Sequence, residues 1–398
     1  MLAVAAAATA GWLAVDAGPL ADIAIFRDSA QAVLNGQSPY VLGPAPFVYP
    51  PAGLLLALLT ALGPNLHVAA ALWVALSLAA LARTLWILTQ TAWPTLEVPK
   101  LLRRVCWLFA AGCLLEPTLL TLALGQVGLL LLWLTVEGTR GQPQHARRVW
   151  LVGVAAAMKL TPGVLLLGFA AAGRWRSVLW GGVGLMGATT VAAVASPAAI
   201  RDYVSGAWRL PLDANTRLNV QNHSLPNLSA LLGWPSWVGL SLAAIALIAG
   251  TAVAARLWRL GDELAGLSTV LVTGLLVSPV SWGHHWVATY PALVLLLREV
   301  KTRRVWCLAL LSTAFVGGST WLDFGGSKDD ELLSSGEIWT PWPLLEHDWY
   351  LLWGVAFLIW ATVLAVRGQL SRITESNDVA DPKETGCQGT IHPSRRTV

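Results

Sequence analysis

Long apolar stretches recur along the chain, and they constrain its fold more than any other feature. Residues 67–90, 176–196 and 236–257 are examples in which charged side chains are almost absent. Charged residues make up 12% of the whole chain, about half the share found in soluble domains. Because about 20 apolar residues are enough to cross a bilayer as a helix, we predict an all-α polytopic integral membrane protein with about ten to twelve transmembrane or re-entrant helices.

The connections between the apolar stretches fall into two groups that differ in charge. Lysine and arginine dominate the connections at 97–104, 140–148, 172–176 and 298–304. The connections 16–48, 197–235 and 321–348, taken together, contain 12 acids and 5 bases. Basic residues concentrate on the cytoplasmic side of membrane proteins. The pattern therefore predicts a multi-pass protein of the inner (plasma) membrane, with the first group of connections in the cytoplasm and the second group outside.

The chain is predicted to form one membrane-embedded domain and a tail. Residues 1–366 contain all the apolar stretches, and 1–15 is interpreted as a first span because no basic region precedes it as in a cleaved signal peptide. Residues 367–398 are polar and are predicted to be a disordered cytoplasmic tail. The four cysteines show no zinc or disulfide spacing, so we expect no structural metal and no cofactor.

Two apolar stretches contain residues that interrupt a helix. Pro50 lies at the start of 49–63, and Lys159 lies inside 149–171. The charge topology requires 149–171 to return to the side from which it came. Since irregular backbone at membrane depth is tolerated where it lines a cavity, we expect a cavity beside these two breaks.

The external loop 16–48 begins with a helical pattern. Ile23, Phe26 and Ala30 fall on one face of a helix, and Asp28 falls on the opposite face. This spacing predicts a short external amphipathic helix that lies flat on the outer membrane surface.

Asp22 and Lys159 are the charged candidates for a functional site. Asp22 could act as a general base that takes a proton from a hydroxyl group, or it could cap the helix that follows it. An ammonium group in an apolar stretch is costly and indicates a function. Lys159 would pair with an anionic phosphate or with Glu116, unless its side chain extends to the membrane interface.

Neutral polar residues gather at the same predicted external ends. Tyr49, Gln126 and Asn222 offer hydrogen bonds suited to sugar hydroxyls, although loop capping would also explain each of them. His284 and His285 could bind a phosphate or a metal. No carboxylate stands at metal-ligand spacing from them, so we expect no metal site.

These clusters, in this order, resemble glycosyltransferase family 87, a group of actinobacterial GT-C-type membrane enzymes that includes polyprenol-phosphate-mannose-dependent alpha-mannosyltransferases. The stretches that carry the resemblance are DIAIFRDSAQAVLNGQSPY (22–40), FVYPPAGLLLALLTALG (47–63), LGQVGLLLLWL (124–134), AAAMKLTPGVLLLGFAAAGRWR (155–176), QNHSLPNLSALLG (221–233) and SPVSWGHHWV (278–287). The resemblance implies that Asp22 is the catalytic base. The family commonly has glutamine where this chain has His223.

The resemblance further implies an inverting transfer of a hexose, most simply mannose, on the external face. The donor would be a polyprenyl phosphate sugar in the lipid bilayer, and the acceptor a cell-envelope glycolipid or glycan. Lys159 and one of His284 or His285 would stabilise the departing phosphate.

Two other functions remain open at this stage. A transporter or flippase for lipid-linked sugars would also need broken helices and charge within the membrane. A non-catalytic scaffold would use the polar clusters only for packing and capping. The sequence contains no nucleic-acid-binding module, and it does not indicate an oligomeric state.

Overall fold

The computed structural model describes residues 21–41, 47–212, 219, 221–301 and 348–380, together with isolated positions within 5–8 and 304–311. Every regular element in this part of the chain is a helix, and its β-type pairing is the isolated bridge between Asn222 and Trp282. The predicted all-α class is therefore confirmed.

The α-helices are α2 (Ala21–Leu34), α3 (Leu54–Thr60), α4 (Leu66–Ala92), α5 (Val98–Cys113), α6 (Glu116–Leu124), α7 (Gly128–Thr139), α8 (Trp150–Met158), α9 (Val164–Ala171), α10 (Trp175–Ala195), α11 (Pro197–Ser205), α13 (Leu225–Leu231), α14 (Ser236–Arg259), α15 (Glu263–Val277), α16 (Tyr290–Glu299) and α20 (Trp349–Ala380). Short 3₁₀ helices are η1 (Pro39–Val41), η2 (Pro51–Gly53), η3 (Ala146–Val149), η4 (Thr161–Gly163), η5 (Ala207–Leu212) and η6 (Gly283–Thr289).

Several of these helices are long and apolar enough to cross a membrane. Within the described residues, α4, α10, α14 and the Trp349–Arg367 part of α20 meet this condition, and α5 with α6 would make a fifth span, bent by 66°. Four shorter apolar segments accompany them. The multi-pass membrane architecture is thus confirmed, while the total of about ten to twelve spans or re-entrant helices stays a prediction.

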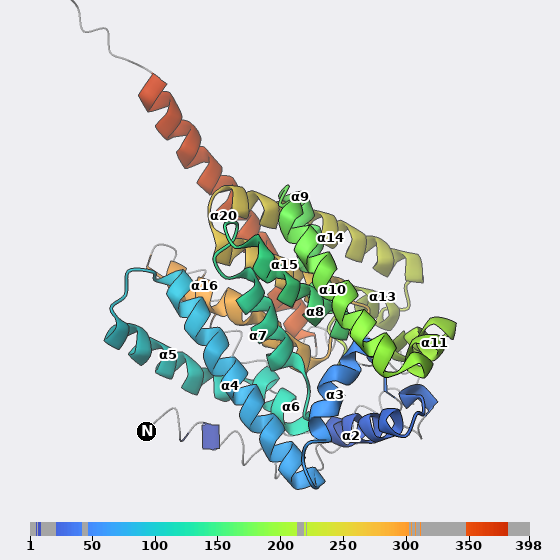
Figure 1. Ribbon diagram of the computed structural model, residues 1–398. Helices are drawn as coiled ribbons and strands as arrows, with labels where there is room; N and C mark the ends of the chain where they lie inside the picture. The colour runs from blue at the N-terminus through green and yellow to red at the C-terminus, as the bar shows by residue number, and fades with distance from the viewer. Residues whose placement is uncertain are drawn as a thin grey trace, which may run out of the picture.

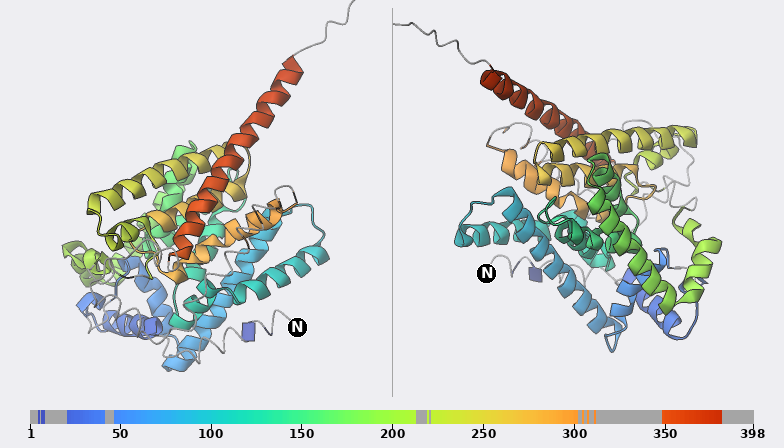
Figure 2. Two further views of the ribbon diagram at one scale, coloured as in Figure 1. Left: turned by 180° about the vertical axis from the view of Figure 1, so that it is seen from behind. Right: turned by 45° about the horizontal axis from the view of Figure 1, so that its top comes forward.

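Parts of two predictions fall beyond the described residues. The interpretation of 1–15 as a first span lies outside them, apart from three isolated positions, and so does the tail segment 381–398. Helix α20 continues past the predicted domain boundary at residue 366 as far as Ala380. Its far end extends away from the rest of the molecule in all views (Figures 1 and 2).

The predicted helix breaks are present. Helix α8 ends at Met158, and Lys159 adopts an extended backbone with φ −152° and ψ 126° before the 3₁₀ turn η4 and helix α9 begin. Pro162 stands at the start of η4, where its missing N–H group removes no helical hydrogen bond. Because α8 ends at Met158, Lys159 lies in irregular backbone and not on the surface of a helix.

Helix α2 has the predicted amphipathic pattern. Ile23, Phe26 and Ala30 are buried, and Asp28 is exposed. The apolar face packs inside the protein against α3 and the segment before it, where the Phe26 ring lies 5.4 Å from that of Tyr49. The position of α2 on a membrane surface stays a prediction.

Helices α8 and α10 cross at glycines. An added Cβ on Gly184 would lie 1.9 Å from the carbonyl oxygen of Trp150, and one on Gly153 would lie 1.9 Å from that of Gly181. Small residues allow such close backbone approach between membrane helices. Figure 1 shows α10 running from the end near α9, at the top of the view, to α11 at the lower right, near α2 and α3.

Candidate active site

A cavity of about 920 Å³ opens beside the break at Lys159. Pro50 also lines it, so the cavity expected beside these two breaks is present. The predicted site residues that line it are Asp22, Tyr49, Gln126, Lys159, His284 and His285. They come from α2, the segments before η2 and α7, the break after α8, and η6.

Asp22 reaches the cavity from the first turn of α2. Its carboxylate accepts a hydrogen bond from the Nε2 amide of Gln126, a residue 104 positions away in the chain. Burial raises the pKa of the Asp22 carboxyl above its ordinary value, while the bond from Gln126 and the charge of Lys159 both act to lower it. Asp22 is therefore a partly desolvated carboxylate with one fixed donor, which is a suitable environment for a general base.

Gln126 is oriented by tyrosine. The Tyr49 hydroxyl donates to Gln126 Oε1 at 2.7 Å, which leaves the amide nitrogen facing Asp22. The Tyr40 hydroxyl in turn donates to the Tyr49 carbonyl at 2.8 Å. Tyr49 and Gln126, predicted as sugar ligands, thus also hold the carboxylate in place.

A glycine makes this arrangement possible. Gly125 ends α6 in the left-handed region with φ 72°. An added Cβ there would lie 2.2 Å from Cγ1 of Ile23, the neighbour of Asp22. Since only glycine combines this backbone conformation with room for Ile23, α2 can approach Gln126 closely.

Lys159 faces the same cavity and contacts His285. Its Nζ lies 2.6 Å from His285 Nε2 and 5.4 Å from the centre of the Tyr49 ring. The His285 ring also hydrogen-bonds to the backbone of Val280. Because an ammonium group only donates, Nε2 is the accepting nitrogen and the proton of the neutral imidazole is assigned to Nδ1.

His284 offers a second imidazole. Its ring stands perpendicular to that of His285, with the ring centres 4.5 Å apart. The backbone carbonyl of His284 accepts a hydrogen bond from Thr121 on α6 at 3.2 Å, which fixes this turn of η6. Its Nε2 atom is buried, and no group in the described part of the chain hydrogen-bonds to it. This nitrogen can therefore serve a ligand.

Asn222 lies behind the site rather than on its wall. Its fully buried side chain accepts a hydrogen bond from the Ser281 N–H at 2.7 Å and donates to the Pro279 carbonyl at 3.0 Å. These bonds tie its loop to the segment that leads into η6. Asn222 is not among the residues that line the cavity, and its contact with a substrate stays a prediction.

Glu116 hydrogen-bonds to Tyr350 at the start of α20. It is the first residue of α6, immediately after the 66° bend from α5. The hydrogen bond of Lys159 goes to His285, and Glu116 begins α6 directly before Pro117.

Several cavity residues were not found from the sequence. Tyr203 on α11 and Trp208 on η5 come from the connection 197–235, in which only Asn222 and His223 are named from the sequence. Leu160 and Leu167 add an apolar wall, and their side chains are 68% and 52% exposed. Exposed leucines in an apolar stretch resemble any lipid-facing residues, so the sequence carries no signal for this wall.

The cavity thus combines the Asp22 carboxyl group, the Lys159 amine and an apolar side. Such a set suits the activation of a hydroxyl group beside an anionic amphiphile. Within the described residues, no three His, Cys, Asp or Glu side chains are grouped as metal ligands would be.

The chain is similar to several mannosyltransferases of mycobacteria. A polyprenol-phosphate-mannose-dependent alpha-(1-2)-phosphatidylinositol mannoside mannosyltransferase of Mycolicibacterium smegmatis is 29% identical over 93% of this chain and 89% of its own length. The protein of that name from Mycobacterium tuberculosis is 29% identical over 87% of this chain and 83% of its own. A phosphatidylinositol pentamannoside mannosyltransferase of Mycolicibacterium smegmatis is 31% identical over 66% of this chain and 62% of its own.

No solved structure matches the chain. The profile of Glycosyltransferase family 87, in contrast, matches residues 47–279, which include the break at Lys159 and the loop of Asn222. This match covers more than half of the chain and agrees with the cavity chemistry and the relatives. The protein is therefore a membrane-embedded mannosyltransferase that belongs to glycosyltransferase family 87.

Proposed function

We propose that the protein transfers mannose from polyprenyl phosphate mannose to a phosphatidylinositol mannoside or a related envelope glycolipid, with Asp22 as the general base. The observation that carries the proposal is that Asp22 and Lys159 line one cavity together. The names of the relatives support this donor and this acceptor. The charge topology supports a reaction on the external face of the plasma membrane.

The proposed step is a single displacement. Asp22 takes the proton of an acceptor hydroxyl as that oxygen forms a bond to the anomeric carbon of the sugar. The bond between this carbon and the phosphate oxygen breaks, and polyprenyl phosphate leaves with the electron pair. Attack from the opposite side inverts the anomeric centre, so a β-linked donor gives an α-linked mannoside.

Lys159 and the histidines stabilise the leaving phosphate. An ammonium group has three N–H donors, so the bond from Lys159 to His285 leaves donors for a phosphate oxygen. The Nε2 atom of His284 supplies a further hydrogen bond. Preorganised groups of this kind each contribute about 10²- to 10³-fold in rate.

The apolar wall is suited to the lipid part of the donor. Leu160 and Leu167 flank the polar groups and remain exposed, and Leu247 of α14 lines the cavity beside them. A polyprenyl chain placed along this wall would leave its phosphate next to Lys159. Family membership also supports an enzyme over the transporter that the sequence left open.

The test compares Asp22→Asn with Asp28→Asn, two isosteric changes on the same helix. Asp28 is exposed and does not line the cavity. With purified protein in vesicles, labelled polyprenyl phosphate mannose and phosphatidylinositol mannoside acceptors, we expect Asp22→Asn to lower kcat/KM by about 10²- to 10⁴-fold, because the general base is lost. Asp28→Asn should transfer mannose at the wild-type rate.

Each part of the proposal has its own contrary result. Full activity of Asp22→Asn at equal protein level would remove Asp22 as the base while leaving the transfer intact. If the wild type transfers no mannose to any of these acceptors, the donor or acceptor assignment is wrong. A product resistant to α-mannosidase would contradict inversion of a β-linked donor.

A further inference from the structure

A second cavity, of about 580 Å³, lies between the loop before α8 and the loop before α10. Arginine dominates its lining, through Arg147, Arg148, Arg174 and Arg176. None of these residues takes part in the candidate active site. The cavity is therefore a concave, strongly basic surface without a role in the proposed reaction.

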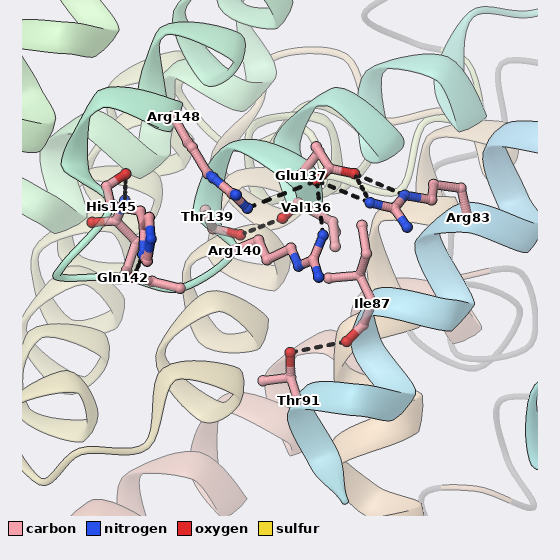
Figure 3. A network of polar contacts seen from close by, with 11 residues as sticks. Arg83, Ile87, Thr91, Val136, Glu137, Thr139, Arg140, Gln142, His145 and Arg148 are labelled. Atoms are coloured by element: carbon pink, nitrogen blue, oxygen red, sulfur yellow. Dashed lines mark hydrogen bonds and ion pairs between the residues drawn. The ribbon is translucent and has the colours of Figure 1, made fainter. Parts of the chain in front are cut away.

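The positive charge of this cavity is only partly neutralised. Glu263 accepts two hydrogen bonds from Arg174, at 2.7 and 2.5 Å. Glu137 receives two from Arg83, at 2.9 and 3.2 Å, and Arg148 lies 4.0 Å from it (Figure 3).

Two of the arginines lack an acidic partner. Among the ion pairs of the described residues, none includes Arg147 or Arg176. The guanidinium of Arg147 lies instead 5.9 Å from the Trp180 ring centre. Both guanidinium groups can therefore bind an anion without first breaking an ion pair.

The basic cavity and the candidate active site lie at opposite ends of the same helices. Helix α8 begins beside Arg148 and ends beside Lys159, and α7 runs from Gln126 toward Glu137. At the basic end, Trp150 and Trp175 are 46% and 66% exposed. Tryptophan is enriched at the headgroup level of membranes, which supports placing this cavity among lipid headgroups.

We propose that the cavity binds the phosphate of an anionic phospholipid headgroup from the leaflet opposite the candidate active site. Guanidinium groups bind phosphate through paired N–H donors, and Arg147 and Arg176 have such donors available. Basic pockets between membrane helices are suited to anionic headgroups. The exposed Trp175 favours a lipid over free phosphate as the source of the anion, because it places the pocket at the bilayer surface.

The test measures the rise in melting temperature of the full chain in micelles as short-chain phosphatidylglycerol is added, with short-chain phosphatidylcholine as reference. A ligand that binds only the folded state stabilises it by an amount that grows with the logarithm of the ligand concentration divided by Kd. The double variant Arg147→Gln/Arg176→Gln should weaken phosphatidylglycerol binding by about 25-fold, at about fivefold for each charge. The matched control is Arg103→Gln/Arg367→Gln, which removes the same charge from exposed positions outside the cavity.

Three results would overturn the proposal. These are equal losses of binding in both double variants, equal shifts with the two lipids, and a shift with inorganic phosphate alone as large as that with phosphatidylglycerol. Arg147→Lys/Arg176→Lys tests the geometry, because lysine keeps the charge but lacks the paired donors. We expect the lysine variant to recover only part of the affinity that Arg147→Gln/Arg176→Gln loses, and full recovery would contradict paired-donor recognition.

Equal melting temperatures of all variants without lipid verify that they fold.

Discussion

Asp22 and Gln126 form the contact on which the proposed chemistry depends most. The Gln126 amide donates to the Asp22 carboxylate, and Tyr49 orients this amide. Burial has the opposite effect on the pKa of Asp22, because it favours the neutral acid. A hydrogen bond to an ionised carboxylate stabilises the charged form. The contact therefore keeps a partly buried group available as a base.

This balance predicts a specific pH dependence. Because Asp22 must be deprotonated to act, kcat/KM should fall as the pH is lowered through its pKa, which burial has raised. Gln126→Leu removes a bond that lowers this pKa, so the acidic limb of the pH profile should move to higher pH. The measurement is kcat/KM against pH for the wild type, Gln126→Leu and the control Gln31→Leu on the exposed side of α2. An acidic limb that stays in place or moves to lower pH would contradict the role of Gln126.

The site could be predicted from sequence where a residue was unusual for its surroundings. Lys159 in an apolar stretch and Asp22 before an amphipathic pattern are of this kind. Asn222 was interpreted as a sugar ligand, but it bonds a backbone group 59 residues away, a contact that no local pattern contains. Tyr203 and Trp208 are not found from the sequence, because an aromatic residue in an external connection is not unusual for its surroundings.

At the scale of elements, the close crossing of α8 and α10 positions Lys159. The crossing is formed by backbone against backbone, since side chains are absent at Gly153 and Gly184. Small residues were visible in the sequence, but their partners on the other helix were not. The break after α8 was predictable, because Lys159 and Pro162 both disfavour a continuous apolar helix there.

Two alanine substitutions distinguish the effect of the close helix crossing on stability from the effect of helix propensity. Gly184→Ala would place a methyl group 1.9 Å from the Trp150 carbonyl oxygen, whereas Gly182→Ala meets nothing within 4 Å. We expect Gly184→Ala to destabilise the protein by about 1–3 kcal/mol, as overpacking does. Gly182→Ala should be neutral or stabilising by up to about 1 kcal/mol, through better helix propensity.

Thermal unfolding in detergent, with transfer activity as a second readout, distinguishes the two glycine variants. A lower melting temperature together with weaker transfer is expected only for Gly184→Ala. Equal melting temperatures for the two variants would show that the helices can separate without cost at this point.

At the scale of the whole molecule, polar groups occupy both ends of a short helical layer. The Asp22 and Lys159 cavity lies at one end of α7 and α8, and the arginine-rich cavity lies at the other. Helix α4 spans a longer distance beside them, and α20 extends beyond the body (Figure 2). The molecule therefore presents spans of unequal length to its surroundings.

The length of α7 has a consequence for the bilayer itself. Its 12 residues rise about 18 Å, whereas the hydrocarbon core is about 30 Å thick. If the Glu137 end lies at one surface, Gln126 and Asp22 lie about 12 Å short of the other surface, unless the membrane thins around them. A donor phosphate must then sink to that depth, and every added methylene in the surrounding acyl chains lengthens its path.

Bilayer thickness should therefore act as a rate-determining variable. We expect kcat/KM in phosphatidylcholine vesicles to fall severalfold from short to long acyl chains, since mismatch costs a fraction of a kcal/mol per Å. Transfer measured across such a series, at equal protein incorporation, checks this. A rate indifferent to chain length would mean that the acceptor and the donor phosphate meet at the surface. A falling rate would mean that the enzyme thins the bilayer locally around its site, and that it makes its product fastest in thin regions of a membrane.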